Sequence, residues 1–172
     1  MEDNKILIRE ANINDAPTLE DYLIRLAKET EDKDLKPELV KSGVAKLLVD
    51  QKYGRYIVAH IPSQQADDDQ QSAGHSDIVV GMLMITFEVS PKLGGLCYWI
   101  ESVYVHQDYR KKGIFTSLFN EVVRQAKLDP LAKSIKLYVD HDNERAMKTY
   151  EKLGMNKLAE SNFDEIDVHF SH

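Results

Sequence analysis

The stretch that decides the fold is residues 98–118, which read YWIESVYVHQDYRKKGIFTSL. Its first part is rich in aromatic and β-branched residues, which favour a strand, and we place that strand at 97–105. A short basic loop follows from Arg110 to Gly113. From Ile114 onward, apolar residues recur at helical spacing, which predicts a helix over about 114–127. The order strand, glycine-containing loop and helix allows backbone to approach a ligand closely at the turn.

This turn has the chemistry of an anion site. The first N–H groups of a helix have no partner within the helix, and the helix dipole adds partial positive charge there. Arg110, Lys111 and Lys112 add three full charges. The pattern predicts a cradle for phosphate or pyrophosphate, although a solvated basic turn before an amphipathic helix explains the same residues equally well. The three-glycine dinucleotide fingerprint, the Walker loop and the G-x-S-x-G elbow of hydrolases are absent.

Working outward, alternation and helical periodicity predict the remaining elements. Further strands are expected at 5–10, 56–60, 78–89, 134–139, 155–158 and 165–170. Further helices are expected after a cap at Asn14 or Asp15, from Pro37, and from Asn143 to Leu153. The resulting order is β-α-α-β-β-β-α-β-α-β-β, a mixed α/β fold of the α+β kind that is not a doubly wound sheet. The strand at 78–89 is apolar enough to be covered on both faces.

Composition limits the class of protein. The chain has 172 residues, which suits one domain over 1–172, and a formal net charge of −7. The acidic balance argues against nucleic-acid partners, which need basic patches. We expect no membrane span and no signal peptide, and therefore a cytoplasmic protein. Cys97 is the only cysteine, and the histidines lack metal-ligand spacing, so no metal is expected.

The segment from Ile61 to Asp77 breaks the pattern of the chain. It is rich in aspartate, glutamine and serine and has almost nothing to bury. We interpret it as a flexible surface loop, with a functional acidic lid as the alternative.

Two motifs give the chain a resemblance to a known family. Residues 98–118 resemble the acetyl-CoA-binding core of the GCN5-related N-acetyltransferases (GNAT). Residues 110–114 fit that family's loop pattern Q/R-x-x-G-x-G/A, and Phe115 stands where glycine or alanine is usual. A second pattern, N-x-x-A-x-x-x-Y-x-x-x-G, is matched by Asn143, Ala146, Tyr150 and Gly154. The family's fold implies a central mixed, mostly antiparallel sheet with helices on both faces.

The resemblance implies acetyl-CoA as co-substrate and a route for it across the chain. Its pyrophosphate would lie on backbone N–H groups between Lys111 and Thr116, and its pantetheine arm would pair with the backbone of 103–105. Phe115 is expected to turn away from the phosphates into the apolar row of the helix. Asn143 would support the pantetheine arm. The implied residues are Val103, Tyr104, Val105, Arg110, Lys111, Lys112, Gly113, Ile114, Phe115, Thr116 and Asn143.

Two residues are candidates for catalysis. Tyr150 occupies the position at which the family often carries a general acid toward the sulfur; a core tyrosine is the alternative. Glu101 is the candidate base. Simple alternation places it on one strand face with Trp99, Val103 and Val105, where an apolar setting would raise its pKa. A surface acid, or a contact for a cationic substrate, explains Glu101 as well, and a bulge in this strand would change its face.

The function implied is transfer of acetyl from acetyl-CoA to a primary amine, by direct attack in a ternary complex. A small-molecule amine is the first hypothesis. Acetylation of a protein or peptide is the second, and a non-catalytic domain that senses acyl-CoA is the third. The expected partners are acetyl-CoA and the amine, with a homodimer suggested by the many relatives that pair.

Overall fold

The computed structural model describes residues 5–62, 77–140, 142–157 and 164–169, the last range for its backbone alone. The helices and strands follow the predicted order, with short 3-10 turns at Ile13–Asp15 and Gln107–Tyr109. The strands are β1 Leu7–Glu10, β2 Gly54–Ile61, β3 Ile78–Ser90, β4 Gly95–Val105, β5 Ala132–Val139, β6 Asn156–Lys157 and β7 Asp164–His169. The helices are α1 Ala16–Glu31, α2 Pro37–Val49, α3 Ile114–Leu128 and α4 Glu144–Lys152.

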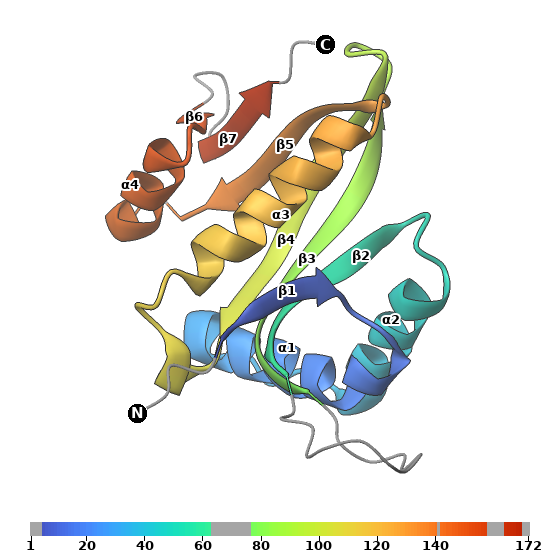
Figure 1. The fold of residues 1–172 in the computed structure, drawn as a ribbon, viewed down its shortest axis with the longest axis vertical. Helices are drawn as coiled ribbons and strands as arrows, with labels where there is room; N and C mark the ends of the chain where they lie inside the picture. The colour runs from blue at the N-terminus through green and yellow to red at the C-terminus, as the bar shows by residue number, and fades with distance from the viewer. Residues whose placement is uncertain (1–4, 63–76, 141, 158–163, 170–172) are drawn as a thin grey trace.

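The strands form one mixed sheet in the order β1-β2-β3-β4-β5-β7-β6. Only β4 and β5 pair in parallel; the other pairs are antiparallel. Figure 1 shows α3 crossing one face of the sheet, and α1 and α2 covering the lower part of the other. The predicted fold class, a mostly antiparallel sheet with helices on both faces, is confirmed.

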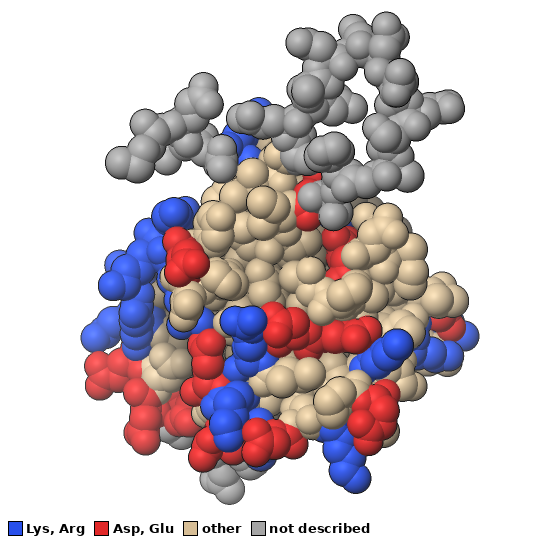
Figure 2. Space-filling model, turned by 90° about the horizontal axis from the view of Figure 1, so that it is seen from below, with Lys and Arg blue, Asp and Glu red and all other residues tan. Residues whose placement is uncertain are grey.

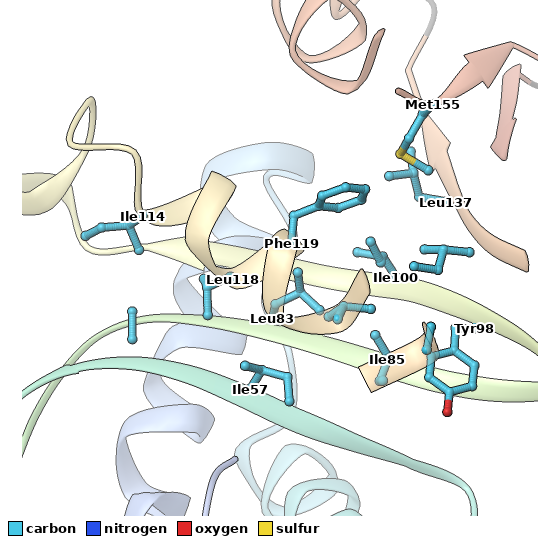
Figure 3. Packing of buried hydrophobic residues seen from close by; sticks show 14 of the residues in the cluster. Ile57, Leu83, Ile85, Tyr98, Ile100, Ile114, Leu118, Phe119, Leu137 and Met155 are labelled. Carbon is cyan, nitrogen blue, oxygen red and sulfur yellow. The ribbon is translucent and has the colours of Figure 1, made fainter. Parts of the chain in front are cut away.

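Each face of the sheet has its own apolar core. Below α3, the apolar row Ile114, Leu118 and Val122 packs on inward residues of β2 to β5 such as Leu83 and Ile100. Figure 3 shows this packing, with Phe119 and Met155 closing it toward α4. The second core joins α1 and α2 to the sheet through Leu19, Tyr22, Val44, Met82 and Tyr104, among others. The two cores fix both ends of β4 relative to α3 and α1.

The strand β3 differs from its prediction. Its first half is buried on both faces, but Glu88 and Val89 near its end are exposed. The prediction that both faces are covered along the whole strand is therefore wrong for the second half, because α1 and α2 do not extend that far (Figure 1).

The start of α1 also differs. The side chain of Asn12, not Asn14 or Asp15, caps the preceding 3-10 turn by accepting from the Asn14 N–H at 2.9 Å. Asp15 makes no cap bond to α1. Its carboxylate instead accepts hydrogen bonds from Arg9 at 2.7 and 2.9 Å. Asp15 therefore stands at the N-cap position of α1, as predicted, but its carboxylate does not cap the helix because the half-buried Arg9 binds it.

Of the predicted loop at 61–77, Ile61 is the last residue of β2, and residues 63–76 lie outside the described part of the chain. Within the described residues, no helix is long and apolar enough to cross a bilayer.

Candidate functional site

The two parallel strands separate halfway along β4. Pairing between β4 and β5 ends at Ile100 and Leu137, although β4 continues to pair with β3 as far as Val105. In the part of the chain that the structure describes, no strand pairs with the other edge of β4 beyond Ile100. An open strand edge presents backbone N–H and C=O groups to an extended ligand. The segment of β4 predicted for the pantetheine arm, Val103 to Val105, lies along this open edge.

A pocket of about 280 Å³ lies beside the open edge. It is lined by Val103, Phe115, Asn143, Arg145, Ala146, Thr149 and Tyr150. The fold thus brings together five residues that the sequence had singled out, namely Val103, Phe115, Asn143, Ala146 and Tyr150. Arg145 and Thr149 join them from α4.

Tyr150 lies on the wall of this pocket. Its ring packs edge-on against Phe115, with the ring centroids 5.6 Å apart. Burial raises the pKa of the Tyr150 hydroxyl above its ordinary value of 10.0. The group therefore keeps its proton at neutral pH, as a proton donor must.

The turn before α3 has the geometry of an anion cradle. Lys111 and Gly113 both take left-handed backbone conformations, with φ of 65° and 74°. The first hydrogen bond of the helix runs from the Ser117 N–H to the Gly113 carbonyl, so the N–H groups of residues 114–116 precede the helical ladder. A Cβ at Gly113 would meet nothing within 4 Å, so a ligand has room to approach these N–H groups.

The cations of the turn divide between two roles. Arg110 turns toward α1, where it donates to Glu29 at 2.6 Å and to the Val105 carbonyl at 2.9 Å. Lys111 and Lys112 are exposed, and the Lys112 ammonium lies 5.0 Å from the centre of the Tyr109 ring. Figure 2 shows Lys and Arg side chains gathered at the left of the view, the side on which Figure 1 places this turn and α4.

The remaining residues of the predicted coenzyme A path take separate positions. Phe115 packs toward Phe119, with ring centroids 6.1 Å apart, as expected from the apolar row of the helix. Ile114 is buried and Thr116 half-buried. Tyr104 directs its buried side chain to the α1 face, so only its backbone lies along the open edge. Asn143 caps α4 by accepting from the Ala146 N–H at 3.1 Å.

Glu101 has a different setting from the predicted one. It is the extra residue of a β-bulge, because Ile100 pairs with Ile85 and Ser102 with Met84. The bulge places Val103 and Val105 on the α3 face, while Glu101 accepts from Thr86 Oγ1 at 2.8 Å. Its side chain is exposed, so the apolar surroundings that the prediction assumed are absent. The predicted shared face was wrong for Val103 and Val105, because simple alternation ignores the inserted residue.

Sequence reasoning missed Glu29. This residue of α1 accepts hydrogen bonds from the Tyr104 hydroxyl at 3.0 Å and from Arg110, so it joins β4 to the turn before α3. The hydrogen bond from Arg110 holds the pKa of Glu29 below its usual value. No sequence pattern links residues this far apart. Arg145 and Thr149, by contrast, are four residues apart on α4, a spacing that places them on one face of the helix.

The sequence and the fold of this protein are similar to those of known acetyltransferases. A family model described as the acetyltransferase (GNAT) family matches residues 42–155. A crystal structure of a possible acetyltransferase from Clostridium difficile 630 is 35% identical, with 97% of this chain and 99% of that chain covered and a TM-score of 0.77. No curated protein matches the chain.

Two less similar structures share the fold. Arabidopsis thaliana NAA60 in complex with acetyl-CoA is 19% identical, covering 96% of this chain and 98% of that one, with a TM-score of 0.68. AAC(6')-Iy in complex with the bisubstrate analogue CoA-S-monomethyl-acetylneamine is 14% identical, covering 92% and 96%, also with a TM-score of 0.68. The family model spans more than half of the chain and both sequence motifs fall within its bounds, so this protein belongs to the GNAT family of acetyltransferases.

Proposed function

We propose that the protein transfers the acetyl group of acetyl-CoA to a primary amine of a small molecule, by direct attack in a ternary complex. The observation that carries the proposal is the alignment of three features along one path. The first turn of α3 supplies Phe115 to a pocket that is also lined by Val103, on the open edge of β4, and by Tyr150.

Each part of acetyl-CoA has a suitable partner on this path. The pyrophosphate would lie on the N–H groups of the first turn of α3, where the helix dipole favours an anion. The pantetheine arm carries amides, and the backbone of Val103 to Val105 can hydrogen-bond with them as with an added strand. The side-chain carbonyl of Asn143 is occupied as a helix cap, so its support of the arm would come from its amide NH2 group.

The reaction can be written with every proton accounted for. The neutral amine nitrogen attacks the thioester carbonyl carbon, a C–N bond forms, and the C–S bond breaks. The departing thiolate takes a proton from the Tyr150 hydroxyl. The proton that the amine nitrogen loses when it becomes an amide returns to Tyr150 through solvent, so the hydroxyl is restored. Because Tyr150 remains protonated at neutral pH, it can serve as this donor.

Glu101 would receive the proton that the ammonium loses before attack. It lies on β4 at the point where β5 departs, and its exposed carboxylate can exchange protons with water. This position supports the role of a base or of a contact for a cationic amine, without the desolvation expected from the sequence.

The experiment is a thiol-release assay with acetyl-CoA and a panel of small primary amines, together with thermal unfolding. Acetyl-CoA should raise the melting temperature, since a ligand that binds only the folded state stabilises it. Thiol release with at least one amine, matched by an acetylated product in mass spectrometry, is the expected result. Stabilisation by acetyl-CoA without transfer to any amine or peptide would instead favour a sensor of acyl-CoA.

A further inference from the structure

Phe115 joins the first turn of α3 to the helix that carries Tyr150. Its backbone N–H is one of those that precede the helical ladder of α3. Its ring packs edge-on against the Tyr150 ring, with the centroids 5.6 Å apart. Phe115 stands where glycine or alanine is usual in the family's loop pattern, and neither of those residues carries a ring. The contact between the cradle and Tyr150 is therefore a feature of this chain's own sequence.

The helix α4 has little support of its own. None of its 9 residues, all of which the structure describes, is fully buried. Tyr150 is half-buried and packs against the core below α3. Figure 1 shows α4 at the margin of the molecule, above the start of α3. Because a short helix depends on tertiary packing for its stability, the contact of Tyr150 with Phe115 contributes to the placement of both the ring and the helix.

The Tyr150 hydroxyl differs from those of two core tyrosines. The Tyr22 hydroxyl donates to the Val79 carbonyl at 2.7 Å, and the Tyr98 hydroxyl donates to Asp129 at 2.7 Å. Among the residues that the structure describes, the Tyr150 hydroxyl has no such partner. The direction of this hydroxyl therefore depends on how its ring is packed, and the group is available to a ligand.

The Phe115 ring is itself held by α3. It packs against the ring of Phe119, one turn further along the helix, with the centroids 6.1 Å apart. Phe119 is buried in the core. Phe115 and Tyr150 both line the pocket beside the open edge of β4. The Phe115 ring thus connects a firmly packed helix to the tyrosine on the pocket wall.

We propose that Phe115 is a positioning residue for acetyl transfer, whose ring fixes the Tyr150 side chain so that its hydroxyl faces the departing thiolate. This inference rests on the proposed function and assigns a role that glycine or alanine at this position cannot fill. A proton donor must lie within hydrogen-bond reach of the atom that it protonates, so a displaced ring lowers the rate. Because the N–H of Phe115 belongs to the cradle, a bound pyrophosphate also restrains the residue that carries the ring.

The test replaces the aromatic ring with an aliphatic side chain in the full chain. Thiol release is followed at saturating acetyl-CoA, with the small primary amine of the panel that gives the fastest release. In Phe115→Leu we expect kcat to fall about tenfold, because one proton donor is misplaced, while the KM for acetyl-CoA changes by less than about threefold.

Phe87→Leu is the matched control. Phe87 is also half-buried, packs on the same core and contacts a tyrosine, with its ring centroid 4.7 Å from that of Tyr98. It lies on β3 and is not among the residues that line the pocket. The variant should keep the kcat of the unaltered protein.

A double-mutant cycle measures whether Phe115 acts through Tyr150. Tyr150→Phe removes the hydroxyl, so no donor is left to position. In that background, Phe115→Leu should lower kcat by less than about twofold. A general loosening of the pocket would instead lower kcat by the same factor in both backgrounds.

Thermal unfolding checks that each variant is folded, and Phe115→Met takes the place of Phe115→Leu if the leucine variant does not fold. Full kcat in the folded variant, a rise in the KM for acetyl-CoA alone, an equal loss in Phe87→Leu, or the same loss in both backgrounds would overturn the inference while the proposed function stands. Full kcat in Tyr150→Phe would remove Tyr150 as the donor and the inference with it. Absence of thiol release with every amine would overturn the proposed function itself.

Discussion

The two halves of β4 have the same kind of sequence but different surroundings. Residues 96–100 pair with β3 on one side and with β5 on the other, and Ile100 is buried beneath α3. Beyond the bulge, residues 102–105 pair with β3 alone, and the half-buried Val103 lines a pocket. The first half holds the fold together, and the second half leaves a strand edge for a ligand. A strand can thus serve stability and binding in successive segments when its neighbour departs.

The largest effect should come from the group beside the open half. Tyr150→Phe removes only the hydroxyl of a residue that lines the pocket, and loss of a general acid typically lowers kcat by about 100-fold or more. Because burial raises the Tyr150 pKa, the acid is lost only above pH 10.0, so kcat should show no basic limb from this group below that pH. Steady-state kinetics across pH checks both points.

The control for this prediction is Tyr56→Phe. Tyr56 is buried on β2 in the core under α1 and α2, and burial raises its pKa to about 12. It should keep the kcat of the unaltered protein. Retention of full kcat by Tyr150→Phe would assign Tyr150 to packing instead of catalysis.

The comparison within β4 can be tested by matched truncations. Ile100→Ala should lower the free energy of unfolding by about 2–4 kcal/mol, because it leaves a cavity in a packed core. Val103→Ala should cost only about 1 kcal/mol, since the side chain is half-exposed, yet should weaken acetyl-CoA binding more than Ile100→Ala does. Urea unfolding and calorimetric titration measure the two quantities. If Ile100→Ala and Val103→Ala lost the same free energy of unfolding and bound acetyl-CoA equally well, the two halves of β4 would not differ in role.

The turn before α3 should respond to a single methyl group. Gly113→Ala places a side chain at φ 74°, where an L-residue pays about 1–2 kcal/mol in backbone strain, although no atom obstructs its Cβ. Acetyl-CoA affinity should fall as well, because the strained turn positions the N–H groups less well. Gly43→Ala lies inside α2 with nothing nearby and should instead stabilise the protein slightly. Urea unfolding of both variants provides the comparison.

The smallest effect is expected at the link between α1 and the turn. Glu29 and Arg110 are both more than 40% exposed, so Glu29→Gln should change the free energy of unfolding by less than about 1 kcal/mol. The KM for acetyl-CoA should rise about threefold, because Arg110 loses its charged partner, while the KM for the amine stays unchanged. Asp21→Asn breaks an exposed pair on the same helix and should alter neither KM. A rise in both KM values in Glu29→Gln would point to a general loss of structure.

The local sequence pattern was sufficient to predict most of the fold. Periodicity and turn residues predicted every helix and strand, with small shifts at their ends, because each element buries a regular apolar face. The predicted start of α2 at Pro37 and the end of α4 before Gly154 are confirmed. Asp15 occupies the predicted N-cap position of α1, but its side chain does not cap the helix because Arg9, which lies on β1, takes the carboxylate.

The candidate site was predictable where it depends on local motifs. The turn at 110–113 and the helix that carries Tyr150 are each one contiguous segment. Their backbone conformation depends mainly on their own residues, so it could be predicted from the sequence. The environment of Glu101, the partner of Arg110 and the position of Trp99 against Tyr138 depend on a bulge and on strand pairing. Such contacts join residues far apart in the chain, which no local pattern encodes.

By itself, the amino-acid sequence determined the order of the elements, the glycine turn and the two motifs that place the chain in its family. Only the tertiary structure decided which side chains share a face, because one inserted residue in β4 reverses the alternation. It also decided where β4 loses its neighbour. Pairing between β4 and β5 ends at Ile100 and Leu137, and the open edge on which the proposed chemistry depends begins there. Strand pairing joins residues far apart in the chain, so the position of this edge could not be read from local pattern.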